Sequence, residues 1–306
     1  MVMSRRDVIR LFGAAAAGAP FLDCLGQRQG TVASTTAGAI QFGYAAITWG
    51  GKDEQAMDDI ASVGFRGIQL RANILPQFGD RPGALRELLG AHHLTMVALS
   101  SGNLSIDPSA AREQLEQHTK NANFMKQVGG LYLQIIDERP RGRAVGADDY
   151  ATLGRLLTEL GKRTADVGVP VAYHPHMGSL GERPEQIRAI LHASDPRYVK
   201  LLLDTAHYQQ GGGDPAAAIR EYADRLLLLH IKDLQSPVPG GATGSYRFVE
   251  LGRGKVDFKR VFDALAEIKF NGWGIVELDG VTEAARSPKE SAMISRKYLE
   301  SLGFQL

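Results

Sequence analysis

The 306-residue sequence predicts an α/β protein with one domain, a (β/α)8 TIM barrel. From about residue 40, short apolar runs rich in β-branched and aromatic residues alternate eight times with longer segments of helical period. Residues 40–306 have the length of such a barrel, which is typically about 250 residues. An open doubly wound sheet would need a glycine-rich phosphate turn after the first strand, and the segment from Ile47 to Gly51 does not have that pattern.

Eight runs are predicted as strands because they are short, apolar and bounded by turn residues. The seventh run begins with four consecutive leucines, which predicts a parallel strand buried on both faces. In chain order the predicted strands are Gln41–Thr48, Arg66–Arg71, Leu94–Ser100, Leu131–Asp137, Pro170–His174, Val199–Asp204, Leu226–Ile231 and Gly274–Glu277.

Eight helices are predicted between and after these strands. Proline at or near the first turn marks several of the starts, because its missing N–H would be unpaired there in any helix. The Gly/Ser/Pro-rich segment Ser236–Ser245 is predicted as a long loop, which serves either as a lid or as a plain flexible connection. The predicted helices are Glu54–Val63, Gly83–Ala91, Ala110–Val128, Asp148–Val167, Pro184–His192, Pro215–Asp224, Phe258–Ile268 and Pro288–Leu302.

Residues 1–39 are predicted to be an export signal and spacer, followed by the barrel domain over 40–306. Arg5 and Arg6 precede a weakly apolar Ala/Gly-rich stretch, a pattern similar to a twin-arginine signal. That stretch is shorter than the roughly 20 residues of a membrane-spanning helix. We therefore expect contact with the twin-arginine translocase during export, a periplasmic location and no stable membrane insertion after processing. The alternative is an ordinary basic amphipathic first helix.

Charge and cysteine content exclude several classes of protein. The chain has 35 Lys and Arg against 34 Asp and Glu, and this net charge of +1 gives no long-range field to attract nucleic acid or anionic lipid. Cys24 is the single cysteine, so no intramolecular disulfide forms. We expect a small-molecule partner and no nucleic acid, and the composition is compatible with a homo-oligomer.

Side chains that bind metals end four consecutive predicted strands, the fifth to the eighth. Active sites of this fold are built from the loops after the carboxyl ends of the strands. Two imidazoles and two carboxylates suit a divalent transition ion, with manganese or cobalt favoured over zinc, iron or magnesium. Each residue alone has a plainer role, as a helix cap or a packed polar side chain. Together, the expected ligands of one divalent ion are His174, Asp204, His230 and Glu277.

Further residues near the strand ends are assigned to catalysis or substrate binding. Histidines titrate near neutral pH and suit proton transfer, and a lysine can neutralise an enolate oxygen or protonate a leaving group. The expected catalytic residues are Glu277, His207, His176 and Lys232. The expected substrate contacts, with an aromatic wall for a sugar ring, are Trp49, His176, His207, Glu138 and Arg253.

Two of these assignments have structural alternatives of equal weight. Lys232 could pair with Asp233 or Glu277 as a structural ion pair, and Trp49 could simply plug the mouth of the barrel. Glu138 opens a long loop, where charged residues are usually solvated.

Several motifs resemble those of the xylose isomerase-like TIM-barrel superfamily of sugar phosphate isomerases and epimerases. Within that superfamily, the segments 43–49 and 173–179 are similar to inosose dehydratases. The resemblance extends from about residue 40 to 304, and it implies one divalent ion at the four strand ends with His207 facing the substrate. The superfamily motifs are Asp204-Thr205-Ala206-His207, His230-Ile231-Lys232-Asp233, the segment 251–258 and the segment 272–277.

The fifth strand departs from the epimerase pattern of this superfamily. Those enzymes have Glu where His174 stands, and they use two glutamates on opposite faces of the substrate to remove and return a proton. Only Glu277 of that pair remains, although a histidine or Glu138 could replace the missing base. We therefore expect proton abstraction α to the carbonyl of a keto-sugar or keto-cyclitol, followed by β-elimination as in a dehydratase or lyase.

Three other functions remain as alternatives. A sugar isomerase or epimerase would use the same enediolate chemistry. A non-catalytic periplasmic carbohydrate-binding barrel would bind sugar after metal removal and would not exchange the α-proton. The apurinic-site endonucleases share the barrel, but they use several zinc ions and a basic surface for DNA, which the near-zero net charge disfavours.

Overall fold

The computed structural model describes residues 40–306, so the predicted export signal lies outside the described residues. Within residues 40–306, no helix combines the length and the apolar character that crossing a bilayer requires.

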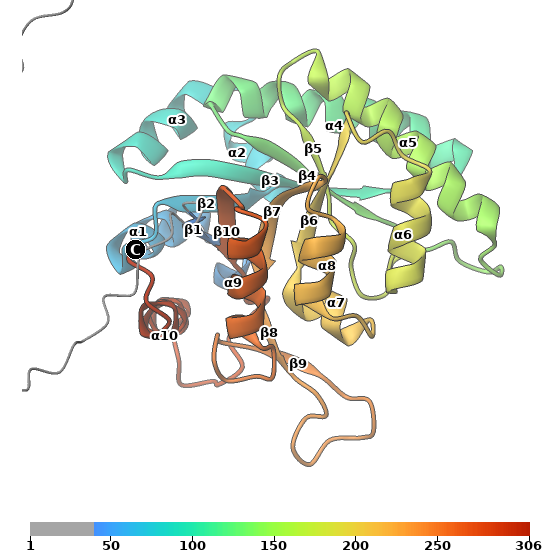
Figure 1. Cartoon of the computed structure of the whole chain (residues 1–306). Helices are drawn as coiled ribbons and strands as arrows, with labels where there is room; N and C mark the ends of the chain where they lie inside the picture. The colour runs from blue at the N-terminus through green and yellow to red at the C-terminus, as the bar shows by residue number, and fades with distance from the viewer. Residues whose placement is uncertain (1–39) are drawn as a thin grey trace, which may run out of the picture. The chain divides into compact units, whose positions relative to one another are not determined.

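Eight parallel strands close into a barrel, which confirms the predicted (β/α)8 fold (Figure 1). Strands that follow one another along the chain are neighbours in the barrel, and pairing of the first with the last closes it in the order β1-β10-β7-β6-β5-β4-β3-β2. The barrel strands are β1 (Ile40–Ala45), β2 (Gly67–Arg71), β3 (Thr95–Leu104), β4 (Tyr132–Asp137), β5 (Val171–Tyr173), β6 (Val199–Asp204), β7 (Leu226–Ile231) and β10 (Gly272–Val276).

Helices connect successive barrel strands and lie around the outside of the barrel (Figure 1). Five of them begin at a proline, as the sequence indicated: α3, α4, α6, α8 and α10. The helices are α1 (Asp53–Val63), α2 (Leu75–Phe78), α3 (Pro82–Ala91), α4 (Pro108–Val128), α5 (Ala147–Ala165), α6 (Pro184–His192), α7 (Thr205–Gln210), α8 (Pro215–Glu221), α9 (Phe258–Glu267) and α10 (Pro288–Ser301), with the short 3-10 turns η1 (Ala46–Trp49) and η2 (Ala72–Ile74).

The barrel strands are buried on both of their faces. Leu201, Leu202 and Leu203 of β6 succeed one another with exposed fractions of 0–1%, which explains the apolar run at the centre of this strand. Gly43 of β1 and Gly67 of β2 are register partners, and a Cβ on Gly43 would lie 2.7 Å from the carbonyl carbon of Gly67. Glycine at this position therefore permits the close approach of these two strands.

The structure differs from the predicted elements in several places, including the short helices α2 and α7, which were not predicted. β1 ends at Ala45, and the next four residues turn into η1 instead of continuing the strand to Thr48. β3 continues to Leu104, four residues beyond its predicted end, through a register shift that includes Gly102 with φ +104°. The predicted loop after β7 is flanked by two short antiparallel strands, β8 (Asp233–Gln235) and β9 (Arg247–Val249).

Candidate metal centre and substrate cavity

Four buried side chains meet inside one end of the barrel, and we refer to them as the four-residue cluster. Each offers one ligand atom, and these atoms all lie within 4.8 Å of one another. The four residues come from the carboxyl ends of β5, β6, β7 and β10, which are adjacent around the barrel. The structure thus brings together the residues that the sequence predicted as ligands: His174, Asp204, His230 and Glu277.

Three atoms of the four-residue cluster are buried without a hydrogen-bond partner: Nδ1 of His174, Oδ2 of Asp204 and Nδ1 of His230. The His230 nitrogen lies 3.4 Å from Oδ2 of Asp204 and 3.4 Å from Oε1 of Glu277. Buried polar atoms are nearly always paired, and imidazole nitrogens with carboxylate oxygens are the donor set of divalent transition ions. The residues present therefore fit a divalent metal ion.

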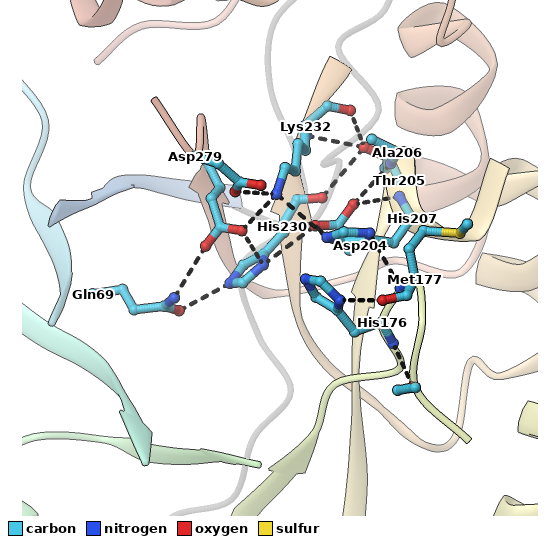
Figure 2. Close-up of polar contacts among 12 residues, drawn as sticks. Gln69, His176, Met177, Asp204, Thr205, Ala206, His207, His230, Lys232 and Asp279 are labelled. Atoms are coloured by element: carbon cyan, nitrogen blue, oxygen red, sulfur yellow. Dashed lines mark hydrogen bonds and ion pairs between the residues drawn. The ribbon is translucent and has the colours of Figure 1, made fainter. Parts of the chain in front are cut away.

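The orientation of two cluster residues is fixed by groups outside the cluster. Oδ1 of Asp204 accepts hydrogen bonds from the backbone N–H groups of Ala206 and His207 at 2.8 and 2.9 Å, so this oxygen caps α7 and the other faces the cluster. Gln69 of β2 reaches across the barrel, where its Oε1 lies 2.9 Å from Nε2 of His230 (Figure 2). A proton on Nε2 leaves Nδ1 of His230 available as a ligand, which is how neighbouring groups set the tautomer of metal-binding histidines.

Lys232 lies directly behind the four-residue cluster. It is completely buried, and its Nζ lies 3.0 Å from Oε1 of Glu277 and 2.5 Å from Oδ1 of Asp279 (Figure 2). The ring of Phe248 in β9 lies against the same ammonium group at 4.0 Å from the ring centroid. Because its own side chain has no exposed surface, Lys232 reaches the cavity only through its contacts with Glu277 and Asp279.

Asp233 does not form the ion pair with Lys232 that was one alternative from the sequence. Its two carboxylate oxygens accept hydrogen bonds from four backbone N–H groups, of Leu234, Gly252, Gly254 and Val256, at 2.8–3.1 Å. Asp233 therefore anchors the segment 251–258, and the Lys232 ion pair is with Glu277 and Asp279.

Charge and burial shift the pKa values of the cluster in a direction that suits a cation. Burial alone would lower the pKa of His230, but the charge of Glu277 and the contact with Asp204 raise it to about 9. Burial alone would raise the pKa of Glu277, and the positive charges of His230 and Lys232 instead hold it well below its ordinary range. Two carboxylates thus converge on one imidazole nitrogen, a position where positive charge is stabilised.

Two further histidines stack beside the cluster. The rings of His176 and His207 are 3.7 Å apart at their centroids, and Nδ1 of His176 lies 2.8 Å from the carbonyl oxygen of Met177 (Figure 2). Burial, and then the charge of Lys232, hold the pKa of His207 well below its ordinary value. His207 is 2% exposed and lies behind His176, which contacts the cavity described next.

A cavity of about 290 Å³ opens beside the cluster. This volume is just below the range of about 300–1,000 Å³ found for drug-sized ligands, so it suits one small ring. The cluster residues His174 and Glu277 form part of its wall. The polar residues that complete the lining are Gln69, Arg71, Asn73, Ser100, Asn103, Gln134, His176 and Asp279.

Besides His207, three other predicted substrate contacts lie outside this cavity. Trp49 is 4% exposed, packs edge-on against Tyr44, and donates a hydrogen bond from Nε1 to Asp59 at 2.9 Å. Trp49 is therefore packed in the protein interior and does not line the cavity. It lies in the 3-10 turn η1 and not in the continuation of strand β1. Glu138 lines an adjoining hollow, which it shares with His176. Arg253 is 42% exposed and lies 3.4 Å from Glu283.

Several residues of this lining were assigned no role from the sequence, among them Gln69, Arg71, Gln134 and Asp279. Gln69 and Gln134 interrupt otherwise apolar strands, and a polar residue inside a strand that is buried on both faces is the signal that could have found them. Asp279 is two residues beyond Glu277, so both side chains can face the cavity. Arg71 ends β2, the position at which function is expected in this fold.

The closed barrel, with two histidines and two carboxylates at four consecutive strand ends, is of the xylose isomerase-like type. The sequence matches the model of the xylose isomerase-like TIM barrel family over residues 57–302, and the chain belongs to this family. An inosose dehydratase of Lacticaseibacillus casei is 28% identical over 300 residues, which cover 86% of this chain and 97% of that protein. The predicted family resemblance is thereby confirmed.

Two solved structures share the fold. IolI protein with a bound zinc atom aligns with a TM-score of 0.72 at 20% identity, covering 86% of this chain and 98% of that one. L-ribulose 3-epimerase aligns with a TM-score of 0.71 at 18% identity, covering 86% and 94%. At these identities the likeness shows the fold alone. The curated relatives in sequence are inosose dehydratases, so the chain belongs to a family that includes such enzymes.

Proposed function

We propose that this protein is a divalent-metal-dependent enzyme that removes the proton α to the carbonyl of a keto-sugar or keto-cyclitol and then eliminates a β-substituent. The observation that carries the proposal is the four-residue cluster, in which three buried ligand atoms lack a protein partner beside a cavity for one small ring. The similarity to inosose dehydratases supports elimination as the outcome.

The residues on the cavity wall can be assigned to the steps of an elimination. When bound, a divalent ion at the cluster supplies positive charge that favours enolisation of the carbonyl group. Glu277 takes the α-proton, and the ammonium group of Lys232 at 3.0 Å keeps this carboxylate ionised and in place. The electrons of the enolate re-form the carbonyl as the β carbon–oxygen bond breaks, and His176 supplies the proton to the departing oxygen.

The distribution of carboxylates around the cavity favours elimination over epimerisation. Among the described residues that line it, the carboxylates are Glu277 and Asp279, which both follow β10. Epimerisation requires a second base on the opposite face of the substrate, and the lining from β2, β3 and β4 offers only neutral polar groups and Arg71 there. Elimination needs one base and an acid beside the leaving group, which Glu277 and His176 provide.

The test combines metal content with two signals from the reaction. The full protein is loaded with Mn²⁺, Co²⁺ or Zn²⁺ and incubated in D₂O with 2-keto-inositol, 3-keto-glucosides and simple ketohexoses, while α-deuterium exchange and enone absorbance are followed. Glu277→Gln should abolish both signals, and His174→Gln should abolish metal binding as well. His118→Gln is the matched control, because His118 is a buried histidine whose ring nitrogens already contact Ser101 and Asn103.

Each alternative gives a different result in this experiment. Exchange with a changed configuration and no enone indicates an epimerase. Sugar binding that survives chelation without exchange indicates a carbohydrate-binding protein. Full activity of Glu277→Gln, or of the metal-free protein, would contradict the mechanism.

A further inference from the structure

The half of the cavity that faces the four-residue cluster carries polar groups that the mechanism does not use. The cluster occupies β10, β7, β6 and β5, which are consecutive around the barrel, and the other half consists of β4, β3, β2 and β1. Arg71 at the end of β2 and Gln134 in β4 belong to this second half, and both line the cavity.

Arg71 brings an unbalanced positive charge to the cavity. In the described part of the chain, its guanidinium makes no hydrogen bond or ion pair with any side chain. The carboxylates that line the cavity, Glu277 and Asp279, are both in contact with Lys232. Asp53 feels the charge of Arg71, but its carboxylate already accepts a hydrogen bond from Asn73 at 2.7 Å. One cation therefore faces the ligand space without a direct partner.

Gln134 gives an independent indication of a ligand at the same wall. Its side chain is 2% exposed, and its Oε1 is buried without a hydrogen-bond partner. Such an atom is rare in a folded protein, because leaving a buried polar group unpaired is costly. Gln69, the other buried glutamine at this level of the barrel, has both of its amide atoms engaged by His230 and Glu277. The Oε1 atom of Gln134 is therefore left without a protein partner at the cavity wall.

We propose that Arg71 and Gln134 recognise a keto-sugar that carries a carboxylate, so that the substrate is a sugar acid held between this wall and the four-residue cluster. The planar guanidinium matches a carboxylate in shape and donates two parallel hydrogen bonds to it. A single unpaired cation balances the single charge of a carboxylate, whereas a phosphate carries a charge of about −1.5 to −2. Gln134 accepts a hydrogen bond from a neighbouring hydroxyl. This inference rests on the proposed function, because it uses the same cavity as the active site.

The charge preference is tested by binding, without turnover. The Mn²⁺-loaded full chain is titrated in a calorimeter with D-glucuronate, D-glucose and D-glucose 6-phosphate, which differ only in the group at C6. The wild type should bind glucuronate about tenfold more tightly than glucose, as expected for one partly exposed charge-assisted contact. Arg71→Met should remove this preference. Arg66→Met is the matched control, since Arg66 is exposed just before the opposite end of the same strand and should leave the preference unchanged.

A second variant separates recognition from a structural role. Gln134→Leu should weaken the binding of both glucose and glucuronate several-fold while the melting temperature of the ligand-free protein stays the same or rises, because an unpaired polar group is removed. A fall in melting temperature with unchanged sugar affinity would show that Gln134 is structural and would overturn its role here.

The outcomes distinguish this inference from the proposed function. Equal affinities for the three sugars, or an Arg71→Met variant that keeps the glucuronate preference, would overturn the inference. If glucose 6-phosphate binds more tightly than glucuronate, and Arg71 is required for this, the site recognises a phosphate instead of a carboxylate. That result would also overturn the inference. An Arg71-dependent glucuronate preference in a protein that exchanges no α-proton would support the recognition site and contradict the proposed enzyme.

Discussion

Replacing Gln69 by leucine tests whether the four-residue cluster is organised to bind a metal. Gln69 is 2% exposed and bridges two cluster residues from the opposite side of the barrel. Its Oε1 is 2.9 Å from Nε2 of His230, and its Nε2 donates to Oε2 of Glu277 at 3.3 Å. Leucine has a similar size and makes neither contact, so the imidazole loses the partner that holds its Nδ1 toward the cluster.

The expected loss can be worked out from these two contacts. A typical hydrogen bond contributes about 1 kcal/mol net, and the contact to the ionised Glu277 is long enough that we give it no more than that. The pair then amounts to about 2 kcal/mol, which is about 30-fold in metal affinity at 1.4 kcal/mol per factor of ten. The value falls within the 10–100-fold range that such supporting residues show in metalloproteins.

The assay is competition for Zn²⁺ or Mn²⁺ against a chromophoric chelator, with thermal unfolding in excess chelator as the measure of folding. Gln134→Leu is the control, because Gln134 is also a buried glutamine on the cavity wall but makes no hydrogen bond with the cluster, and the metal affinity of this variant should equal that of the wild type. A Gln69→Leu affinity within about threefold of the wild type, or an equal loss in Gln134→Leu, would refute the reasoning.

Three further predictions concern other parts of the chain. Asp204→Ser should keep the cap of α7 and the stability of the metal-free protein, whereas Asp204→Ala should cost about 1 kcal/mol; metal titration should show a loss of more than about 100-fold in both. Hydrogen bonds from Arg143 lower the pKa of Asp149 from 3.8 to about 2, so this pair stabilises the fold above pH 4 and the effect is lost as the pH falls through 2. Asp149→Asn should therefore lower the melting temperature at pH 6 and have little effect at pH 2. We also propose that Arg5 and Arg6 direct export, so that changing both to Lys should retain the protein in the cytoplasm, as cell fractionation would show.

The barrel could be predicted from the sequence because each strand–helix unit carries its own local signal. β6 and β7 contain runs of three and four leucines, as expected for strands that are buried on both faces, and their predicted limits agree with the structure. The ends of β1 and β3 were not predictable in the same way. A 3-10 turn at Ala46 and a register shift before Asn103 depend on packing against neighbouring strands, which a single sequence does not reveal.

The site was predictable to the extent that it depends on topology alone. Residues at equivalent strand ends converge in any closed parallel barrel, so the four cluster residues were identified without coordinates. The depth of a side chain behind the cavity wall depends instead on three-dimensional packing. Lys232 was expected to touch substrate, but the structure buries it completely against Glu277, Asp279 and Phe248. Gln69 comes from the middle of a strand on the other side of the barrel, where a search of strand ends does not look.

Asp204 shows why a plain and a functional role of one residue can both be correct. An aspartate at the end of a strand commonly caps the helix that follows, and such a cap alone would explain its presence. The structure uses Oδ1 for two backbone N–H groups and leaves Oδ2 buried, unpaired and 3.4 Å from Nδ1 of His230. The cap fixes the rotation of the carboxylate, and that fixed rotation is what directs the second oxygen into the cluster. If Asp204 binds a metal as proposed, the helix cap is therefore what positions its ligand oxygen.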